Sequence, residues 1–145
     1  MLDTKEFEQF VTDRFKEKGW RMTAGVRNVA RILAETRVPL SISEIVATVD
    51  TNGKSIDLAT GYRIMDRLDQ IGMSKRVNRK YMPTGDPTNT KEVEHFMICE
   101  KSGKAESIFL NYHDAIAKQL KKEKNFNLMK TEIVFYGTKD YTGDR

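Results

Sequence analysis

The sequence predicts an α+β protein in which a helical N-terminal half precedes a smaller, strand-rich C-terminal half. Three observations predict this class. Apolar residues recur at helical spacing from Phe7 to Ile71, and β-branched and aromatic residues form short runs after residue 92. Between them, residues 83–91 hold two of the three prolines and no large apolar residue, as hinges often do. The 145 residues suffice for one ordinary domain or two small ones.

Capping residues mark the first three helices. Asp3 and Glu6 can form a capping box for the first helix, which Gly19 ends. Ser41 and Glu44 form the same pattern at the start of a short third helix. A second helix between them is expected from its N-cap, its apolar stripe and a closing proline: Thr23, Val26, Val29, Ala30, Leu33 and Pro39.

After a turn at 50–55, Asp57 is the expected N-cap of a fourth helix from Leu58 to Ile71, which Gly72 terminates. The segments MSKRV and KYMP around Asn78-Arg79 follow at once and predict a β-hairpin. Three helices, a fourth helix and a hairpin in this order predict a winged helix-turn-helix domain over residues 1–82. Its third and fourth helices form the helix-turn-helix, and the hairpin forms the wing.

The C-terminal part, residues 92–145, predicts a β-β-α-β unit. The expected strands cover 93–99, 105–110 and 128–136, and the helix covers 114–124. A unit of this size buries little apolar core alone, so we expect it to be a dimerisation domain, joined to the first domain by a hinge at 83–91.

The net charge of +4 comes from one segment of the chain. Residues 53–81 carry seven basic and three acidic side chains, whereas residues 1–52 carry eight of each and residues 82–145 ten of each. A local basic excess of this kind favours a polyanionic partner. No apolar run is long enough for a membrane helix, and the single cysteine, Cys99, cannot form an internal disulfide, so we expect a cytoplasmic protein.

The fourth helix is the expected reader of DNA bases. Thr60, Tyr62 and Arg63 lie on its N-terminal, outward turns, where recognition helices contact base edges. Arginine can bind guanine O6 and N7 together, and tyrosine can pack against a thymine methyl group. Cations of the wing would contact phosphates; they are Lys75, Arg76, Arg79 and Lys80.

A structural interpretation of these residues stays open at this point. Tyr62 could be a half-buried packing residue, and Arg63 could pair with Asp66 or Asp69 on its own helix. Arg67 is less well placed for DNA and is expected to form an intrahelical salt bridge.

The segment from Ser55 to Gly72 resembles the recognition helix of ferric uptake regulator (Fur) proteins, whose pattern is close to S-x-A-T-V-Y-R-x-L-x-x-L-x-x-x-G. Gly19-Trp-Arg-Met-Thr23 is similar to the family's G-L-[RK]-x-T, Ser41–Val46 to its L-S-x-x-E-I, and Ile98–Lys104 to its I-C-x-x-C-G-K. The closing Phe135-Tyr136-Gly137 resembles its L-Y-G. The resemblance runs from about residue 7 to residue 137.

This resemblance implies a homodimeric repressor that binds an A·T-rich inverted repeat of duplex DNA. Tyr62 and Arg63 match the residues that enter the major groove, and Arg21 matches the basic residue that reaches the neighbouring minor groove. The C-terminal unit matches the family's dimerisation domain.

The departures concern the metal ligands that the resemblance implies. The family's His-rich run is here Glu92-Val-Glu-His95-Phe-Met-Ile-Cys99, with one histidine, and the first C-x-x-C pair is Cys99 with Ser102. The second pair is missing from the chain, which has one cysteine and two histidines in all. A tight zinc site needs about four N or S ligands. We therefore expect no metal site and no cofactor, with Cys99 as a small buried apolar residue.

We expect a DNA-binding regulator without metal control. Two alternatives stay open: a metal-responsive repressor with a weak site near Glu92, Glu94, His95, His113 and Asp114, and an interaction module that pairs with an intact member of the family. An enzyme is not expected, because the chain shows no nucleophile–base pair and no phosphate-binding glycine loop.

Overall fold

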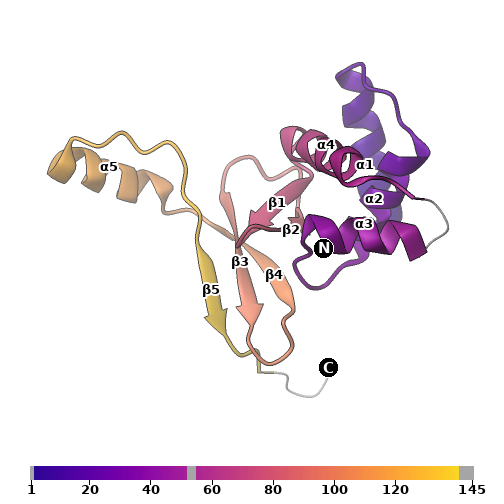
Figure 1. Ribbon diagram of the computed structural model, residues 1–145. Helices are drawn as coiled ribbons and strands as arrows, with labels where there is room; N and C mark the ends of the chain where they lie inside the picture. Colours follow the sequence, from indigo (N-terminus) through magenta and orange to yellow (C-terminus); the bar gives the residue numbers. More distant parts are fainter. Residues whose placement is uncertain (1, 52–54, 141–145) are drawn as a thin grey trace. The chain divides into compact units, whose positions relative to one another are not determined.

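The structure, a computed structural model, describes residues 2–51 and 55–140. Part of the turn expected at 50–55 and the last five residues of the expected dimerisation domain lie outside these ranges. The chain divides into two compact units, Met1–Pro87 and Thr88–Arg145, and the division falls inside the segment 83–91. In the order of the chain, four helices and a hairpin form the first unit, and a three-stranded sheet with one helix forms the second (Figure 1).

The first three helices start where the capping residues predict. In α1 (Thr4–Glu17) the Asp3 carboxylate accepts a hydrogen bond from the Glu6 N–H, and in α2 (Ala24–Glu35) the Thr23 hydroxyl accepts one from the Val26 N–H. α3 (Ile42–Thr51) has both bonds of a capping box: Ser41 N–H donates to Glu44 at 3.0 Å, and Glu44 N–H donates to Ser41 Oγ at 3.1 Å.

The fourth helix and the hairpin also confirm the sequence prediction. α4 (Leu58–Gln70) is capped by Asp57, whose carboxylate accepts from the Thr60 N–H at 2.7 Å. β1 (Ser74–Val77) and β2 (Lys80–Pro83) pair antiparallel. Leu40 joins the hairpin through two backbone hydrogen bonds with Tyr81, and this bridge attaches the wing to the segment before α3.

One apolar core fills the first unit. Each of the four helices contributes buried side chains, and the segment after α4 adds Met73 and Tyr81. The largest of the fully buried residues are Phe7, Phe15, Leu33, Ile45, Met65, Leu68 and Met73. Burying such side chains contributes about 1.5–3 kcal/mol each. This core fixes one face of α4 and leaves the opposite face to solvent.

The second unit is an open sheet with the strand order β4-β3-β5. β3 (Val93–Cys99) pairs antiparallel with β4 (Ala105–Leu110) and parallel with β5 (Val134–Gly137). α5 (His113–Lys124) connects β4 to β5 and has no buried residue. The α+β fold class and this β-β-α-β order are confirmed.

The last strand is shorter than predicted. Residues 128–136 are rich in β-branched and aromatic side chains, yet only Val134–Gly137 forms β5. β5 pairs with Phe96–Cys99, and residues 125–133, including Met129 at 88% exposure, form the connection from α5. Strand propensity requires a neighbouring strand, which this connection lacks. Among the described residues, no helix is long and apolar enough to cross a membrane.

Candidate nucleic-acid interface

The outer face of α4 exposes the residues that the sequence predicts as base readers. Ile64, Met65 and Leu68 anchor the inner face in the core, and the helical period turns Tyr62 and Arg63 to the outside. Tyr62 is 46% exposed, and Arg63 is exposed as well. Thr60 is half-buried beside the helix N-terminus. Tyr62 therefore does not act as a core residue of the first unit.

Arg63 and Arg67 are four residues apart on α4 but have different surroundings. The Arg67 guanidinium lies over the Trp20 ring, 5.0 Å from its centroid, and Trp20 in turn packs edge-on against Phe15. Arg67 was expected to form an intrahelical salt bridge; instead it stacks on the connection between α1 and α2. Within the described residues, no ion pair joins Arg63 to Asp66 or Asp69.

Two carboxylates form capping hydrogen bonds at helix N-termini in this part of the first unit: Asp57 at α4 and Glu44 at α3. The hydrogen bonds from Thr60 lower the pKa of Asp57, and the nearby positive charge of Arg63 lowers it further. The hydrogen bonds from Ser41 lower the pKa of Glu44, and Lys80 adds to this effect. Both groups are therefore negatively charged at neutral pH, and both accept hydrogen bonds from helix N-termini, where negative charge is favourable.

The wing presents cations in three different settings. Arg76 lies over the Tyr81 ring, 4.2 Å from its centroid, which restrains its guanidinium. Arg79 is exposed at the tip, where it and Asn78 have positive φ values of 69° and 51°. These are the conformations of a tight type I′ hairpin turn. Lys75 is half-buried on β1.

Lys80 forms a contact that sequence reasoning missed. Its Nζ lies 3.7 Å from Glu44 Oε1, and both side chains are about half exposed. Glu44 therefore caps α3 and also pairs with the wing. The capping-box pattern reveals the first role, but nothing in the local sequence indicates the second, because the two residues are 36 positions apart.

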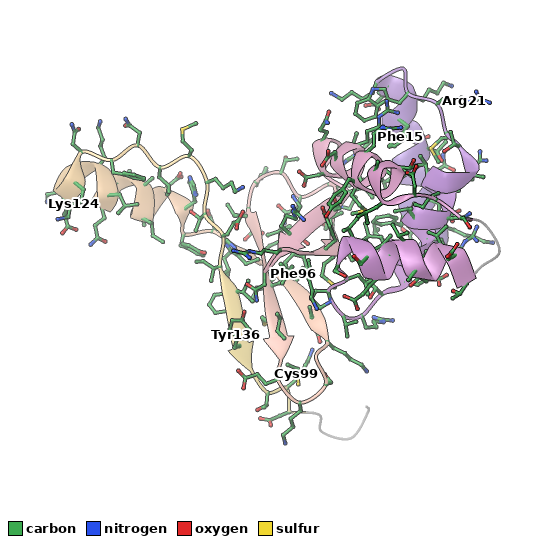
Figure 2. The ribbon with its side chains drawn as sticks, viewed as in Figure 1. Phe15, Arg21, Phe96, Cys99, Lys124 and Tyr136 are labelled. Carbon is green, nitrogen blue, oxygen red and sulfur yellow. The ribbon has the colours of Figure 1, made fainter. Side chains whose placement is uncertain are left out.

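The predicted DNA residues thus belong to three parts of the first unit. Thr60, Tyr62 and Arg63 are on α4, and the wing cations are on the hairpin that follows it. Arg21 is exposed on the connection between α1 and α2 (Figure 2). Trp20, next to it in sequence, is the second residue that sequence reasoning missed, since it connects this segment to α4 through Arg67.

His95, in the second unit, is buried and hydrogen-bonded. Its Nε2 and the Tyr112 hydroxyl are 2.7 Å apart, and the two rings stack with centroids 5.5 Å apart. Burial lowers the pKa of His95, while Glu94 opposes this shift. The other histidine, His113, lies with its Nδ1 3.4 Å from the Thr131 hydroxyl.

Cys99 ends β3 and is half-buried, so the expectation of a buried apolar residue is wrong (Figure 2). Hydrogen bonds from the Lys139 backbone, the Ser102 hydroxyl and the Ser102 and Lys101 backbone lower the pKa of the thiol to about 6. Such bonds favour the thiolate over the thiol. Cys99 also lines a pocket of about 350 Å³ between the strand ends of the second unit.

A winged unit of four helices, the fourth of which exposes Tyr62 and Arg63, followed by a small β-β-α-β unit, defines a class of winged-helix DNA-binding regulators. The sequence profile of the ferric uptake regulator family matches residues 17–136. The chain therefore belongs to this family, and it is a DNA-binding transcriptional regulator rather than an enzyme.

Solved structures with similar folds include other regulators. A zinc uptake regulator complexed with zinc and DNA gives a TM-score of 0.82 at 17% identity, covering 95% of this chain and 93% of that chain. The Helicobacter pylori ferric uptake regulator gives 0.60 at 15% identity, covering 94% and 91%. A zinc-bound manganese uptake regulator gives 0.55 at 23% identity, covering 92% and 98%. A comparison with curated proteins gave no match.

The residues of this chain do not fit the metal sites that the family resemblance implies. Within residues 2–51 and 55–140, no three His, Cys, Asp or Glu side chains come together in a group that could hold a metal ion. His95 Nε2 is hydrogen-bonded to the Tyr112 hydroxyl, and Cys99 and His113 are the other Cys and His side chains of the sequence. A tetrahedral zinc site needs about four such donors converging on one point.

Proposed function

We propose that this protein is a transcriptional regulator that binds duplex DNA as a cytoplasmic homodimer and does so without a regulatory metal. Residues 1–82 would bind DNA, residues 83–91 would act as the hinge and residues 92–145 would dimerise. The exposure of Tyr62 and Arg63 on a helix whose opposite face is locked in the core carries the proposal.

Each DNA residue has a role that fits its setting. Arg63 binds guanine, Tyr62 contacts a thymine methyl group, and Thr60 and the N-terminus of α4 contact phosphate. Lys75, Arg76, Arg79 and Lys80 bind phosphates from the wing, and Arg21 enters the adjacent minor groove. The zinc uptake regulator with a similar fold is complexed with zinc and DNA, which supports the DNA partner proposed here.

Exposed apolar groups of the second unit support a homodimer. Met129 is 88% exposed, and Phe126, Phe135 and Tyr136 are each more than 40% exposed. α5 has no buried residue, and β5 is an edge strand. These apolar side chains are exposed in a single copy of the unit, and a second copy of the chain would cover them.

Metal independence is supported by the surroundings of the two side chains best suited to ligate metal. His95 Nε2 is already hydrogen-bonded to the Tyr112 hydroxyl, so its recruitment as a ligand would break that bond. Within the described residues, Cys99 belongs to no group of three side chains that could hold a metal ion. DNA binding is therefore proposed to depend on α4, the wing and Arg21, and not on a bound metal.

Selection from a random duplex pool tests this function. The purified protein should enrich an inverted repeat in EDTA, and adding zinc, iron or manganese should leave the enriched sequence and its affinity unchanged. Enrichment only with added metal would instead indicate a metal-responsive repressor. Enrichment only in the presence of an intact member of the family would indicate an interaction module.

A further inference from the structure

Arg14 connects two backbone segments that are distant in sequence. From α1, its Nη1 donates to the Ile71 carbonyl at 2.8 Å, and its Nη2 donates to the Pro87 carbonyl at 3.0 Å. Ile71 is the C-cap of the recognition helix α4, and Pro87 is the last residue of the first compact unit. One guanidinium therefore holds the end of α4 and the point where the chain leaves the first unit.

The surroundings of Arg14 suit this role. Its guanidinium lies 5.4 Å from the Phe10 ring centroid, and Nη1 is 3.8 Å from the Met73 sulfur, so the side chain is partly buried and packed. The C-terminus of a helix carries partial negative charge, which a cation stabilises. The planar fork of arginine can donate to two acceptors at fixed positions, whereas a lysine ammonium is a single point charge.

The same region restrains the chain after the wing. β2 ends at Pro83, and the Thr84 N–H donates to the Met73 carbonyl at 3.0 Å. With Pro87 held by Arg14, the segment left to connect the two units is 88–92, since β3 starts at Val93. Five residues reach at most about 17 Å.

We propose that Arg14 is a positioning residue for DNA recognition, which fixes the chain exit against α4 and so restricts the operator half-site spacings that a dimer can bind. This inference rests on the proposed function. A change of one base pair moves a half-site by about 3.4 Å and rotates it around the DNA axis. A short connection tolerates few such changes, and a connection released at Pro87 tolerates more.

Operators that differ only in spacing test the inference. Their half-sites come from the selected inverted repeat, and the spacer is varied by up to two base pairs in either direction. Arg14→Met keeps the apolar stem and loses both donors. Arg31→Met is the matched control, because Arg31 on α2 is exposed and, within the described residues, its ion pair is with Glu8 of α1, 3.4 Å away. Arg14→Lys keeps the charge without the fork.

Wild type and Arg31→Met should both prefer one spacing by about tenfold or more over its neighbours. In Arg14→Met this ratio should fall to about threefold or less, while affinity for an isolated half-site stays near the wild-type value. A purely structural role would lower half-site affinity and leave the ratio intact. Arg14→Lys should also lose most of the preference for one spacing. If Arg14→Met does not fold, the spacing preference of Arg14→Lys tests the positioning role instead.

An unchanged spacing ratio in whichever of the two variants folds overturns the inference about Arg14. If neither variant folds, an Arg14 role confined to stability is the result, and the positioning role is rejected. Failure of the proposed function looks different, because the wild-type protein itself would then bind none of the operators.

Discussion

At the scale of single residues, α4 carries two arginines with different partners. Arg67 is stacked on Trp20, and Arg63 is exposed beside the capped start of the helix. Helical spacing alone predicted that Arg63 is the better DNA residue, but it could not predict the Trp20 contact. That contact joins residues 47 positions apart, and local sequence carries no signal for it.

The two arginines should therefore respond differently to removal. Arg63→Ala should cost about 1–3 kcal/mol of operator binding and relax the preference at one base pair. Arg67→Ala should leave the preference unchanged and lower the free energy of unfolding by about 0.5–1 kcal/mol, because it loses the ring contact. Binding to operator variants that differ at one base pair measures the base preference, and urea unfolding measures the free energy of unfolding. Equal losses on specific and random DNA for Arg63→Ala would remove its base-reading role.

Arg79 has a backbone conformation that favours glycine. A left-handed conformation costs a residue with a side chain about 1–2 kcal/mol, and glycine loses about 0.5–1 kcal/mol through its greater freedom when unfolded. Arg79→Gly should therefore raise the free energy of unfolding by up to about 1 kcal/mol, while it weakens all duplexes similarly and lowers the salt slope by about one. Thermal melting and titrations at several salt concentrations test this. Unchanged DNA affinity would exclude a phosphate contact by Arg79.

Cys99 gives stability a pH dependence with a definite sign. Its pKa is about 6 in the folded protein, below the ordinary value of 9.0, so the folded state favours the thiolate. This contribution is fully present above pH 9 and is lost as the pH falls through 6. The difference in unfolding free energy between wild type and Cys99→Ser should thus grow from pH 6 to pH 9 and then level off. A difference that stays constant with pH contradicts the shifted pKa.

At the scale of helices and strands, most element boundaries could be predicted because caps and turns act locally. Asp3, Thr23 and Asp57 cap the helices that they were expected to cap. The overlong last strand shows the limit of this reasoning, because strand length depends on a partner that is not adjacent in sequence. The packing of α4 against α3 is a further feature of this kind.

Gly61 allows α4 to pack closely against α3. A Cβ atom added there would lie 2.8 Å from Val46 Cγ2, and the short branched side chain of valine has little freedom to move away. Gly61→Ala should destabilise the protein by about 1–3 kcal/mol, because overpacking outweighs the gain of about 1 kcal/mol in helix propensity.

The effect of Gly61→Ala on stability should change sign when the side chain at position 46 is made smaller. In a Val46→Ala background, Gly61→Ala should become stabilising by about 0.5–1 kcal/mol, since only the propensity gain remains. Urea unfolding of the wild type, Gly61→Ala, Val46→Ala and the double variant measures the four stabilities. If Gly61→Ala has the same effect in both backgrounds, Val46 is not the group that restricts this position.

At the scale of the whole molecule, the basic excess of residues 53–81 comes mainly from the four wing cations, because Asp66 and Asp69 balance the two arginines of α4. Among the described residues, four of the seven exposed large apolar side chains lie on the second unit. This separation fits a protein that binds a polyanion with one unit and a second copy of itself with the other. The sequence could predict this division from charge and hydropathy. It could not predict that Tyr112 and Ser102 would engage His95 and Cys99, because those contacts depend on the folded sheet.

The central claim is that the outer face of α4 contacts DNA, and photo-crosslinking from a single position tests it most directly. p-Benzoylphenylalanine is placed at Tyr62 or, as the control, at Glu100, an exposed residue that follows β3 in the second unit. In EDTA, with the selected operator, the protein substituted at position 62 should crosslink to the duplex, and the protein substituted at position 100 should not. Crosslinks to DNA from position 100 and none from position 62 would contradict the account.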